Sequence, residues 1–358
     1  MIRHALVLTA GLGTRLRPLT DVRAKPAMPV AGEPMIRRIV SWLATGGVDD
    51  LVLNLHHRPE TLTRVIGDGG DLGARVRYSW EQPRILGSAG GPRLAREIVG
   101  ADTFFIVNGD TLTDVDITNL ADTHAASGAL VTLALVANRE FLRYGGVQID
   151  EDGCVTGFVR RGPRAEGSFH YIGVQVVTGR VFDGVTPGEA ARSIGGVYDE
   201  MIASRRGSVR GAVCTAAFYD VGTPGDYWRT SQAFAAAGGA SPVAQGFSAV
   251  VGSHIGRGAR IDPAARVTQS IGWDDVDVGA GATIDECIVT YGVRVPAGAV
   301  YQRSILVAGE NDLLVSPLDV GVNSRVPPPQ GVGDAPQGEK GDGGGRRRRH
   351  RSAAAGHD

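Results

Sequence analysis

The sequence has few cysteines and almost no net charge, and both features exclude some classes of protein. Its three cysteines, Cys154, Cys214 and Cys287, lie far apart and fit neither a CxxC motif nor a metal-ligand spacing. We therefore expect them to be small buried hydrophobic residues in a reducing cytoplasm. The formal net charge of −1 gives no general attraction to a nucleic acid or a membrane, so neither is expected as a partner.

Long apolar runs are missing as well. The longest, near residues 129–137, is much shorter than the roughly 20 residues that span a bilayer as a helix. The N-terminal run, residues 5–8, is too short for a signal peptide. A chain of 358 residues is long enough for two domains. The expectation is a cytoplasmic enzyme.

Glycine, in contrast, is abundant, with 52 residues, and two glycines follow the first expected strand. Residues 5–8 predict a buried parallel strand. Gly11 and Gly13 then let the backbone turn tightly, so that its N–H groups form a nest for phosphate oxygens. A hydroxyl and three cations follow: Thr14, Arg15, Arg17 and Lys25. The segment predicts a polyphosphate-binding loop.

Two common phosphate loops do not match this segment. Leu16 stands where a dinucleotide fingerprint needs its third glycine, and no Gly-Lys-Ser/Thr closes a Walker A loop. The segment instead resembles the signature of the sugar-1-phosphate nucleotidylyltransferase family, Gly-x-Gly-Thr-Arg-Leu-x-Pro-Leu-Thr followed by Lys-Pro. The matched residues are Gly11, Gly13, Thr14, Arg15, Leu16, Pro18, Leu19, Thr20, Lys25 and Pro26. The resemblance implies that Arg15 and Lys25 are the catalytic cations.

Strands and helices are expected to alternate in the first part of the chain. Apolar patterns predict strands over 5–8, 51–55, 74–80 and 103–107, with helices over 34–43 and 59–66. Such alternation is typical of a parallel sheet with helices on both faces, which binds ligands at the carboxyl ends of its strands. We expect an α/β fold over residues 1–240, and the resemblance implies a Rossmann-like nucleotidylyltransferase domain with a mostly parallel sheet.

Two aspartates are candidate metal ligands. Asp110 follows the expected strand 103–107 in an Asn-Gly-Asp sequence, which is also ordinary turn chemistry. A carboxylate at a strand end suits Mg²⁺, which takes one or two protein carboxylates and completes its shell with phosphate and water. The family places its metal-binding aspartate in this motif, and residues 218–224 match a second family motif that contains Asp220. The resemblance implies Mg²⁺ held by Asp110 and Asp220.

The resemblance also implies a nucleotide site. Residues 86–91 are dense in small side chains and fall where the family has Leu-Gly-Thr-Ala-Gly against the base, with Ser88 keeping the hydroxyl of that threonine. The thymidylyltransferase form Gln-Pro-x-x-Gly-Leu-Ala is absent, which favours guanylyltransferase-like relatives and GTP. The expected nucleotide-binding residues are Leu8, Ala10, Gly11, Gly13, Thr14, Glu81, Gly87, Ser88 and Asn108.

The part of the sequence expected to bind the sugar matches the family less closely. Arg160 and Arg161 stand where the family has Glu-Lys, and the family's asparagine two residues before Gly173 is missing. Arg161 can offer its planar fork to the sugar phosphate, but Arg160 cannot replace a carboxylate that accepts sugar hydroxyls. The expected residues for the sugar phosphate are Gly109, Tyr144, Gly145, Arg161 and Gly173.

Near the C-terminus, aliphatic residues recur at a spacing of six, as in Ile255, Ile261 and Val267, with glycines between them. This pattern predicts a short left-handed parallel β-helix over residues 247–310, which family members often carry. An acyltransferase usually needs a histidine base, and only His254 is present, so a scaffold or a homo-oligomer contact is the favoured role. Residues 326–358, rich in proline, glycine and arginine, predict a disordered tail.

Together these motifs predict transfer of a nucleotidyl group from an NTP to a sugar 1-phosphate, giving an NDP-sugar and pyrophosphate. The leading hypothesis is a mannose-1-phosphate guanylyltransferase-like enzyme. Uridylyl, adenylyl or thymidylyl transfer to another hexose or heptose 1-phosphate is the alternative within the family. A non-catalytic subunit that binds NDP-sugars is the alternative from another class, because the glutamate and asparagine of the sugar half are lost.

Overall fold

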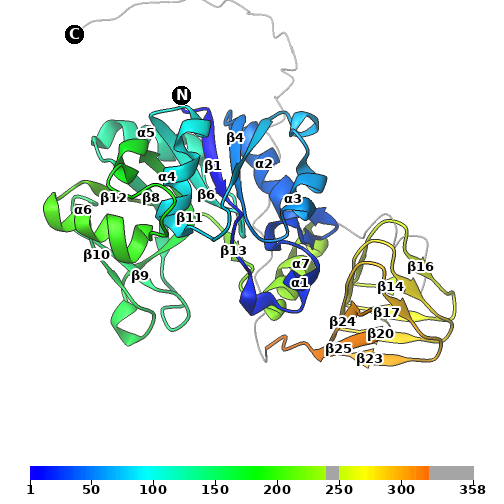
Figure 1. The fold of residues 1–358 in the computed structure, drawn as a ribbon. Helices are drawn as coiled ribbons and strands as arrows, with labels where there is room; N and C mark the ends of the chain where they lie inside the picture. The colour runs from blue at the N-terminus through cyan, green and yellow to red at the C-terminus, as the bar shows by residue number, and fades with distance from the viewer. Residues whose placement is uncertain (239–249, 311, 322–358) are drawn as a thin grey trace, which may run out of the picture.

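The computed structural model describes residues 1–238, 250–310 and 312–321. Figure 1 shows two units beside each other: an α/β unit with a central sheet, and a stack of short strands that begins at residue 250. No helix in the described residues is both long enough and apolar enough to span a membrane. The predicted tail, 326–358, lies outside the described residues.

The α/β unit is built on a nine-stranded sheet. β1 pairs in parallel with β4 and β6, β4 with β5, and β12 with β8, whereas β11 is antiparallel to both β6 and β8. β8 and β12 therefore run in the same direction as β1, and the expectation of a Rossmann-like domain with a mostly parallel sheet is confirmed. The strands are β1 (His4–Leu8), β4 (Asp50–Leu55), β5 (Arg75–Trp80), β6 (Thr103–Asn108), β8 (Val131–Ala137), β9 (Gly146–Ile149), β10 (Val155–Val159), β11 (Phe169–Thr178) and β12 (Val209–Val213).

Alternation along the strands divides the apolar side chains between the two faces of the sheet. Ala5 and Val7 belong to one buried cluster and Leu6 to the other, as the two-residue period of a strand requires. Helices α2, α3, α5 and α7 contribute to the first cluster, and α4 and α6 to the second. The helices are α1 (Leu19–Val22), α2 (Met35–Thr45), α3 (Pro59–Ile66), α4 (Gly87–Val99), α5 (Ile117–Ser127), α6 (Tyr198–Ser204) and α7 (Pro224–Gly238).

Four short strands, which the sequence analysis did not anticipate, complete this unit. β2 (Pro29–Val30) and β3 (Glu33–Pro34) form a hairpin before α2. β7 (Thr111–Thr113) pairs antiparallel with β13 (Phe218–Asp220). Strands of two or three residues carry no periodic pattern of their own, so only their partners define them. The second pair joins segments that are far apart in the sequence.

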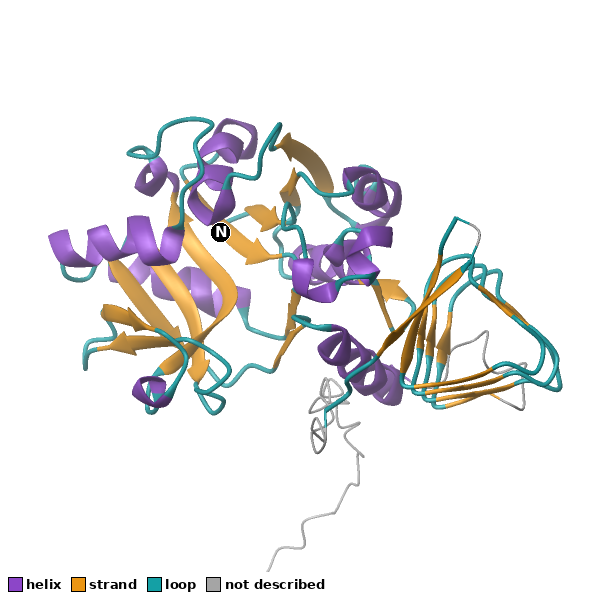
Figure 2. Cartoon of the chain, turned by 60° about the horizontal axis from the view of Figure 1, so that its bottom comes forward, coloured by secondary structure: helices purple, strands orange, loops and turns teal. Residues whose placement is uncertain are grey.

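The C-terminal unit repeats every 17 residues, so that Val250, Val267 and Ile284 are successive partners in parallel strands. Figure 2 shows the coil with three flat sides. This is the expected parallel β-helix, with β25 added antiparallel to β24. Its strands are β14 (Val250–Val251), β15 (His254–Ile255), β16 (Arg260–Ile261), β17 (Arg266–Thr268), β18 (Ile271–Gly272), β19 (Asp277–Val278), β20 (Thr283–Asp285), β21 (Ile288–Val289), β22 (Arg294–Val295), β23 (Val300–Gln302), β24 (Ser304–Ala308) and β25 (Leu313–Pro317).

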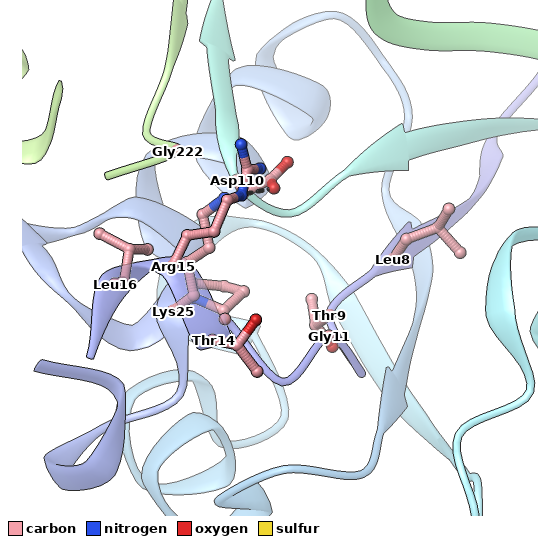
Figure 3. Close-up of a pocket in the computed structure, with 11 residues that line it drawn as sticks. Leu8, Thr9, Gly11, Thr14, Arg15, Leu16, Lys25, Asp110 and Gly222 are labelled. Carbon is pink, nitrogen blue, oxygen red and sulfur yellow. Dashed lines mark hydrogen bonds and ion pairs between the residues drawn. The ribbon is translucent and has the colours of Figure 1, made fainter. Parts of the chain in front are cut away.

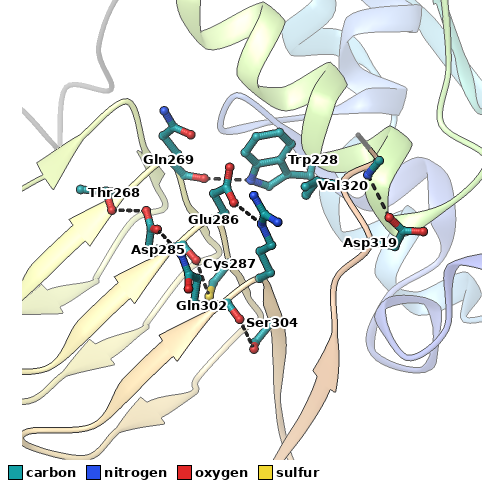
Figure 4. Close-up of polar contacts among 12 residues, drawn as sticks. Trp228, Thr268, Gln269, Asp285, Glu286, Cys287, Gln302, Ser304, Asp319 and Val320 are labelled. Carbon is teal, nitrogen blue, oxygen red and sulfur yellow. Dashed lines mark hydrogen bonds and ion pairs between the residues drawn. The ribbon is translucent and has the colours of Figure 1, made fainter. Parts of the chain in front are cut away.

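Polar side chains form a ladder along this β-helix. Asp285 accepts from the Thr268 hydroxyl at 2.5 Å and from the Gln302 amide at 3.1 Å, each residue one coil away (Figure 4). Arg303 pairs with Glu286 at 2.5 Å in the same way. Contacts between equivalent positions fix the register of successive coils.

Candidate active site

The glycine-rich loop leaves β1 after Leu8 and closes into a 3-10 turn at Thr14–Leu16. Gly13 lies in the left-handed region, with φ of 61°. A Cβ at this position would lie 2.6 Å from Cγ2 of Thr20, whose hydroxyl donates to the Gly13 carbonyl at 2.9 Å. Glycine alone fits both the angle and the contact, which explains the second glycine of the motif.

This loop forms one wall of a pocket at the carboxyl ends of β1 and β6 (Figure 3). Parallel sheets bind ligands at this edge. The lining combines cations, hydroxyls and backbone of the loop with one carboxylate and a glycine from distant segments. The pocket is lined by Leu8, Thr9, Gly11, Gly13, Thr14, Arg15, Leu16, Lys25, Pro26, Asp110 and Gly222.

Lys25 and Asp110 form an ion pair in this pocket, with 2.5 Å between Nζ and Oδ2. The Lys25 side chain is 9% exposed and that of Asp110 is 35% exposed. A buried ammonium needs a partner of opposite charge, and Asp110 provides it. Because the ammonium has three donors, Lys25 can keep this contact and still donate to the oxygens of a ligand.

Asp220, from a distant part of the sequence, lies beside Gly222 of this pocket. The pairing of β13 with β7 sets Asp220 opposite Thr111, the residue after Asp110. A Cβ built on Gly222 would lie 3.4 Å from Oδ2 of Asp220 and 3.5 Å from Nη1 of Arg15. The carboxylate and the guanidinium therefore flank the same glycine of the pocket.

The charges around Asp220 fit a bound divalent cation. Burial, followed by the negative charge of the nearby Asp110, raises the pKa of Asp220, while Lys25 opposes that rise. Two neighbouring carboxylates in a partly buried site are stabilised by a cation, and oxygen ligands are those that Mg²⁺ prefers. Within the described residues no cluster of three or more His, Cys, Asp or Glu side chains could hold a metal ion. Asp110 and Asp220 would thus leave most of the metal's coordination to phosphate and water.

The residues expected to bind the nucleotide do not all lie together. Leu8, Gly11, Gly13 and Thr14 line the pocket. Ala10 is buried, with 4% of its surface exposed, between two residues of the lining. Asn108 is at the end of β6, where a Cβ built on Gly173 would lie 2.8 Å from its Nδ2.

Glu81 is not among the residues that line the pocket. It is fully buried, and its two carboxylate oxygens accept from the Asn54 amide and from the N–H of Leu86, each at 2.6 Å. Both oxygens are thus occupied within the protein, and they hold the turn that leads into α4. A direct contact of Glu81 with a nucleotide stays a prediction.

Gly87 and Ser88 form the first turn of α4. Gly87 has φ of 76°, and a Cβ there would lie 2.8 Å from the Ala191 carbonyl. That carbonyl accepts from the N–H of Ala89 at 3.0 Å, and the Ser88 hydroxyl accepts from the N–H of Ser193 at 2.9 Å. Residues 191–193 therefore cover the start of this helix.

The residues expected to bind the sugar phosphate are spread over a wider area. Gly109 lies next to the phosphate loop, where a Cβ would be 2.8 Å from the Leu8 carbonyl. Tyr144 stacks on His170 with 4.2 Å between ring centroids, and Gly145 follows it just before β9. Arg161 is exposed and pairs with no acidic side chain among the described residues. The structure does not bring Arg161 to the pocket.

A family comparison now identifies the α/β unit. Residues 4–237 match the family model described as nucleotidyl transferase. The chain belongs to the nucleotidyl transferase family. Residues 231–302 match a second model, described as the GlmU-like C-terminal hexapeptide, in agreement with the β-helix.

Three relatives of this nucleotidyl transferase are 30 to 33% identical to it over the aligned residues. A mannose-1-phosphate guanylyltransferase of Mycobacterium tuberculosis is 30% identical over 84% of this chain and 83% of its own length. An N-acetylmuramate alpha-1-phosphate uridylyltransferase of Neisseria meningitidis is 33% identical over 61% of this chain. A D-glycero-alpha-D-manno-heptose 1-phosphate guanylyltransferase of Aneurinibacillus thermoaerophilus is 30% identical over 63% of this chain. These names place the chain among transferases but differ in base and sugar.

Solved structures confirm the fold of the nucleotidyl transferase unit. HddC from Yersinia pseudotuberculosis superposes with a TM-score of 0.56 at 22% identity, covering 64% of this chain and 98% of that one. At this identity the likeness concerns the fold alone.

Sequence reasoning missed a charged network at the start of α7. Arg143 lies over the Tyr144 ring, 4.8 Å from its centroid, and donates to Asp226 at 2.8 Å. Asp226 also accepts from the Thr223 hydroxyl at 2.8 Å and donates its N–H back to that hydroxyl at 3.2 Å. The spacing Thr-Pro-x-Asp is a capping signal that was readable in the sequence. The contact with Arg143 was not.

Proposed function

We propose that this nucleotidyl transferase transfers a guanylyl group from GTP to a sugar 1-phosphate, with mannose 1-phosphate as the favoured acceptor, giving a GDP-sugar and pyrophosphate. The observation that carries the proposal is the convergence of Arg15, Lys25, Asp110 and Asp220 around one pocket. The choice of guanine and mannose is supported by the guanylyltransferase from M. tuberculosis, which this chain matches over 84% of its length.

The reaction needs position and charge more than a reactive side chain. An oxygen of the sugar 1-phosphate attacks the α-phosphorus in line, and the bond from that phosphorus to the oxygen that bridges to the β-phosphate breaks. No covalent intermediate on the protein is required. Holding the two substrates in line supplies much of the rate enhancement.

The cations of the pocket act on the phosphates. Arg15 is exposed at the pocket, where its planar fork can take up the pyrophosphate as negative charge builds on it. Lys25 donates to the phosphate oxygens from its fixed position beside Asp110. Asp110 and Asp220 would hold Mg²⁺, which, when bound, neutralises charge at the α-phosphate.

The nucleoside and sugar contacts complete the proposal. The residues assigned to the nucleotide are Leu8, Ala10, Gly11, Gly13, Thr14, Glu81, Gly87, Ser88 and Asn108. Gly109, Tyr144, Gly145 and Gly173 are assigned to the sugar phosphate. Arg161 is assigned to the same phosphate, and its exposed side chain has to turn toward the pocket when the ligand binds.

The test is pyrophosphate release with Mg²⁺ across four NTPs and a panel of sugar 1-phosphates: mannose, glucose, N-acetylglucosamine and heptose. We expect turnover with GTP and mannose 1-phosphate above every other pair. Turnover with a different pair would retain the reaction class and correct the substrates. No turnover with any pair, together with measurable binding of NDP-sugars, would overturn the enzyme and favour a non-catalytic subunit.

Two further expectations stay predictions: a cytoplasmic location and a homo-oligomer formed through the β-helix. Size-exclusion chromatography with light scattering would test the second. A mass of one chain, 37.4 kDa, would contradict it.

A further inference from the structure

The β-helix buries its largest side chain outside its own core. Trp273 follows β18 and is the largest fully buried side chain of the described residues. It belongs to the apolar cluster of the α/β unit, together with Ile271, Ile288 and Ile305, which are spaced by one coil each. The inward residues of the β-helix, such as Val278, form a separate cluster. One side of the β-helix is therefore an apolar face packed on the α/β unit.

Trp273 contacts two separate segments of the α/β unit. Its indole N–H donates to the hydroxyl of Tyr227 at 2.9 Å, and Tyr227 donates in turn to the carbonyl of Pro29 at 2.5 Å. The Arg23 guanidinium lies over the indole, 5.2 Å from its centroid, and pairs with Asp274 at 3.5 Å.

Both of these segments deliver charged groups to the pocket. Arg23 lies two residues before Lys25, and Pro29 lies four residues after it. Tyr227 is in the first turn of α7, which follows Asp220 and the Gly222 that lines the pocket. The β-helix thus touches the segments that carry Lys25 and Asp220 at one point.

The Lys25 segment needs such support from outside. Between Gly13 and Pro29 the chain has a four-residue helix, α1, and two 3-10 turns. Elements this short are not stable by themselves. Lys25 Nζ nevertheless has to stay within hydrogen-bond distance of Asp110, and a displacement of 1 Å in a catalytic group can cost up to about 100-fold in rate.

We propose that Trp273 is a positioning residue, through which the β-helix holds the Lys25 segment in register with the segment that carries Asp220. This inference rests on the proposed function for its kinetic readout. It gives the β-helix a role in catalysis within one chain, besides any part it has in assembly.

The test compares two tryptophan variants at the same interface. Trp273→Phe removes the indole N–H and part of the surface under Arg23. Trp228→Phe is the matched control, since its indole N–H donates at 2.8 Å to the Gln269 carbonyl of the β-helix (Figure 4), whereas within the described part of the chain the Arg23 guanidinium and the Pro29 carbonyl are linked to Trp273 and Tyr227. We expect Trp273→Phe to lower kcat about tenfold with the KM of both substrates within about twofold, and Trp228→Phe to leave kcat unchanged. Equal kcat in wild type and Trp273→Phe would overturn the proposal.

Hydrogen exchange gives a readout that does not need turnover. The N–H groups of Ala27 and Met28 are protected by the carbonyls of Ala24 and Lys25, at 2.9 and 3.1 Å. In Trp273→Phe we expect faster exchange in residues 19–30, and in Trp228→Phe none. An inactive wild type would overturn the proposed function alone, whereas unchanged exchange in Trp273→Phe would overturn the positioning role.

A milder variant covers the case in which Trp273→Phe does not fold. Asp274→Asn keeps the indole and removes the ion pair with Arg23, in which the Asp274 side chain is 44% exposed. The Arg23 side chain in this pair is 17% exposed. An ion pair near the surface contributes about 1 kcal/mol or less, so we expect a folded protein with kcat lowered about twofold. Wild-type kcat and wild-type exchange in this variant would count against the role of the Arg23 contact.

Discussion

The proposed phosphate half of the site and the proposed sugar half differ in how their polar groups are paired. In the phosphate half, which comprises residues 11–25 with Asp110 and Asp220, the buried Lys25 has its counter-charge at 2.5 Å. In the sugar half, residues 138–145 and 160–173, three buried polar atoms have no partner among the described residues. They are Oδ1 of Asn138, Nδ1 of His170 and the hydroxyl of Tyr171.

This difference sets the free-energy cost that each half carries for its buried polar groups. A buried charge without a partner is costly, and in the phosphate half the ion pair between Lys25 and Asp110 avoids this cost without a substrate. A neutral buried group without a partner costs about 1–3 kcal/mol. The three unpartnered atoms of the proposed sugar half carry this cost among the described residues.

The largest expected effect comes from the phosphate half. Asp110→Asn removes one of the two carboxylates proposed to hold Mg²⁺ and the counter-charge of Lys25, so we expect turnover to fall by at least about 1,000-fold, since metal stabilisation of the transition state is worth several kcal/mol. Pyrophosphate release measures it, and circular dichroism checks the fold.

Asp116→Asn is the matched control for that variant. Asp116 caps α5 by accepting from the N–H of Asn119 at 3.0 Å, and asparagine caps a helix as well as aspartate does. The control makes the same change of charge on a nearby loop and should retain full activity. Wild-type turnover in Asp110→Asn would show that Asp110 is not a ligand of the metal.

The second largest effect is expected at Lys25. Lys25 and Lys340 are the only lysines in the sequence, which otherwise uses arginine for its basic residues. We expect Lys25→Ala to lower kcat by about 100-fold or more, the cost of one preorganised transition-state contact. Lys25→Arg should rescue little, because the broad guanidinium does not fit where a compact ammonium is 91% buried. An unchanged kcat in Lys25→Ala would show that the phosphate assignment is wrong.

The phosphate half could be predicted from the sequence because its signal is local. Gly13, Arg15 and Lys25 lie within one short segment, and the turn that Gly13 makes depends on Thr20, seven residues away. Asp220 was found through a motif match, and the β7–β13 pairing that brings it to Asp110 was not foreseen. The strands of the sheet were predictable for the same reason, since each carries its own apolar pattern.

The sugar half and the start of α4 were less predictable because their contacts are long-range. Ser88 meets Ser193 across 105 positions, and Arg143 meets Asp226 across 83. Glycine-rich sequence weakens a helix, yet α4 begins at Gly87 because the Ala191 carbonyl accepts from its first N–H groups. No local pattern encodes such a contact.

A smaller effect is expected at Arg161, and it should be confined to binding of the sugar 1-phosphate. If this exposed side chain turns in to bind the sugar phosphate, Arg161→Ala should raise the KM for the sugar 1-phosphate about tenfold, the loss of one charge-assisted contact. The KM for the NTP should stay within about twofold. Arg160→Ala, the exposed neighbour, is the control. Equal kinetic constants in Arg161→Ala and wild type would show that Arg161 does not bind the sugar phosphate.

The smallest effect at neutral pH is expected at His170, which tests the sugar half through stability. Burial lowers the pKa of His170 to about 4 from an ordinary 6.5, so the imidazole is neutral in the folded protein at pH 7. Between pH 6.5 and about pH 4 the imidazole of His170 is protonated in the unfolded chain but neutral in the folded protein. The free energy of unfolding therefore falls as the pH falls through this range. The loss can reach roughly 3 kcal/mol.

Urea unfolding of wild type and His170→Gln at pH 7.5, 6.0 and 5.0 measures this loss. The variant also loses the ring contacts with Tyr144 and Phe218, at 4.2 and 4.9 Å between centroids, so its stability at pH 7.5 is expected to be lower. The change in stability between pH 6.0 and pH 5.0 decides the test, because only a group that titrates differently in the folded and unfolded states can alter it. A shallower slope in His170→Gln would show that the sugar half keeps a neutral imidazole buried, whereas parallel slopes would mean that His170 takes up its proton in the folded state as well.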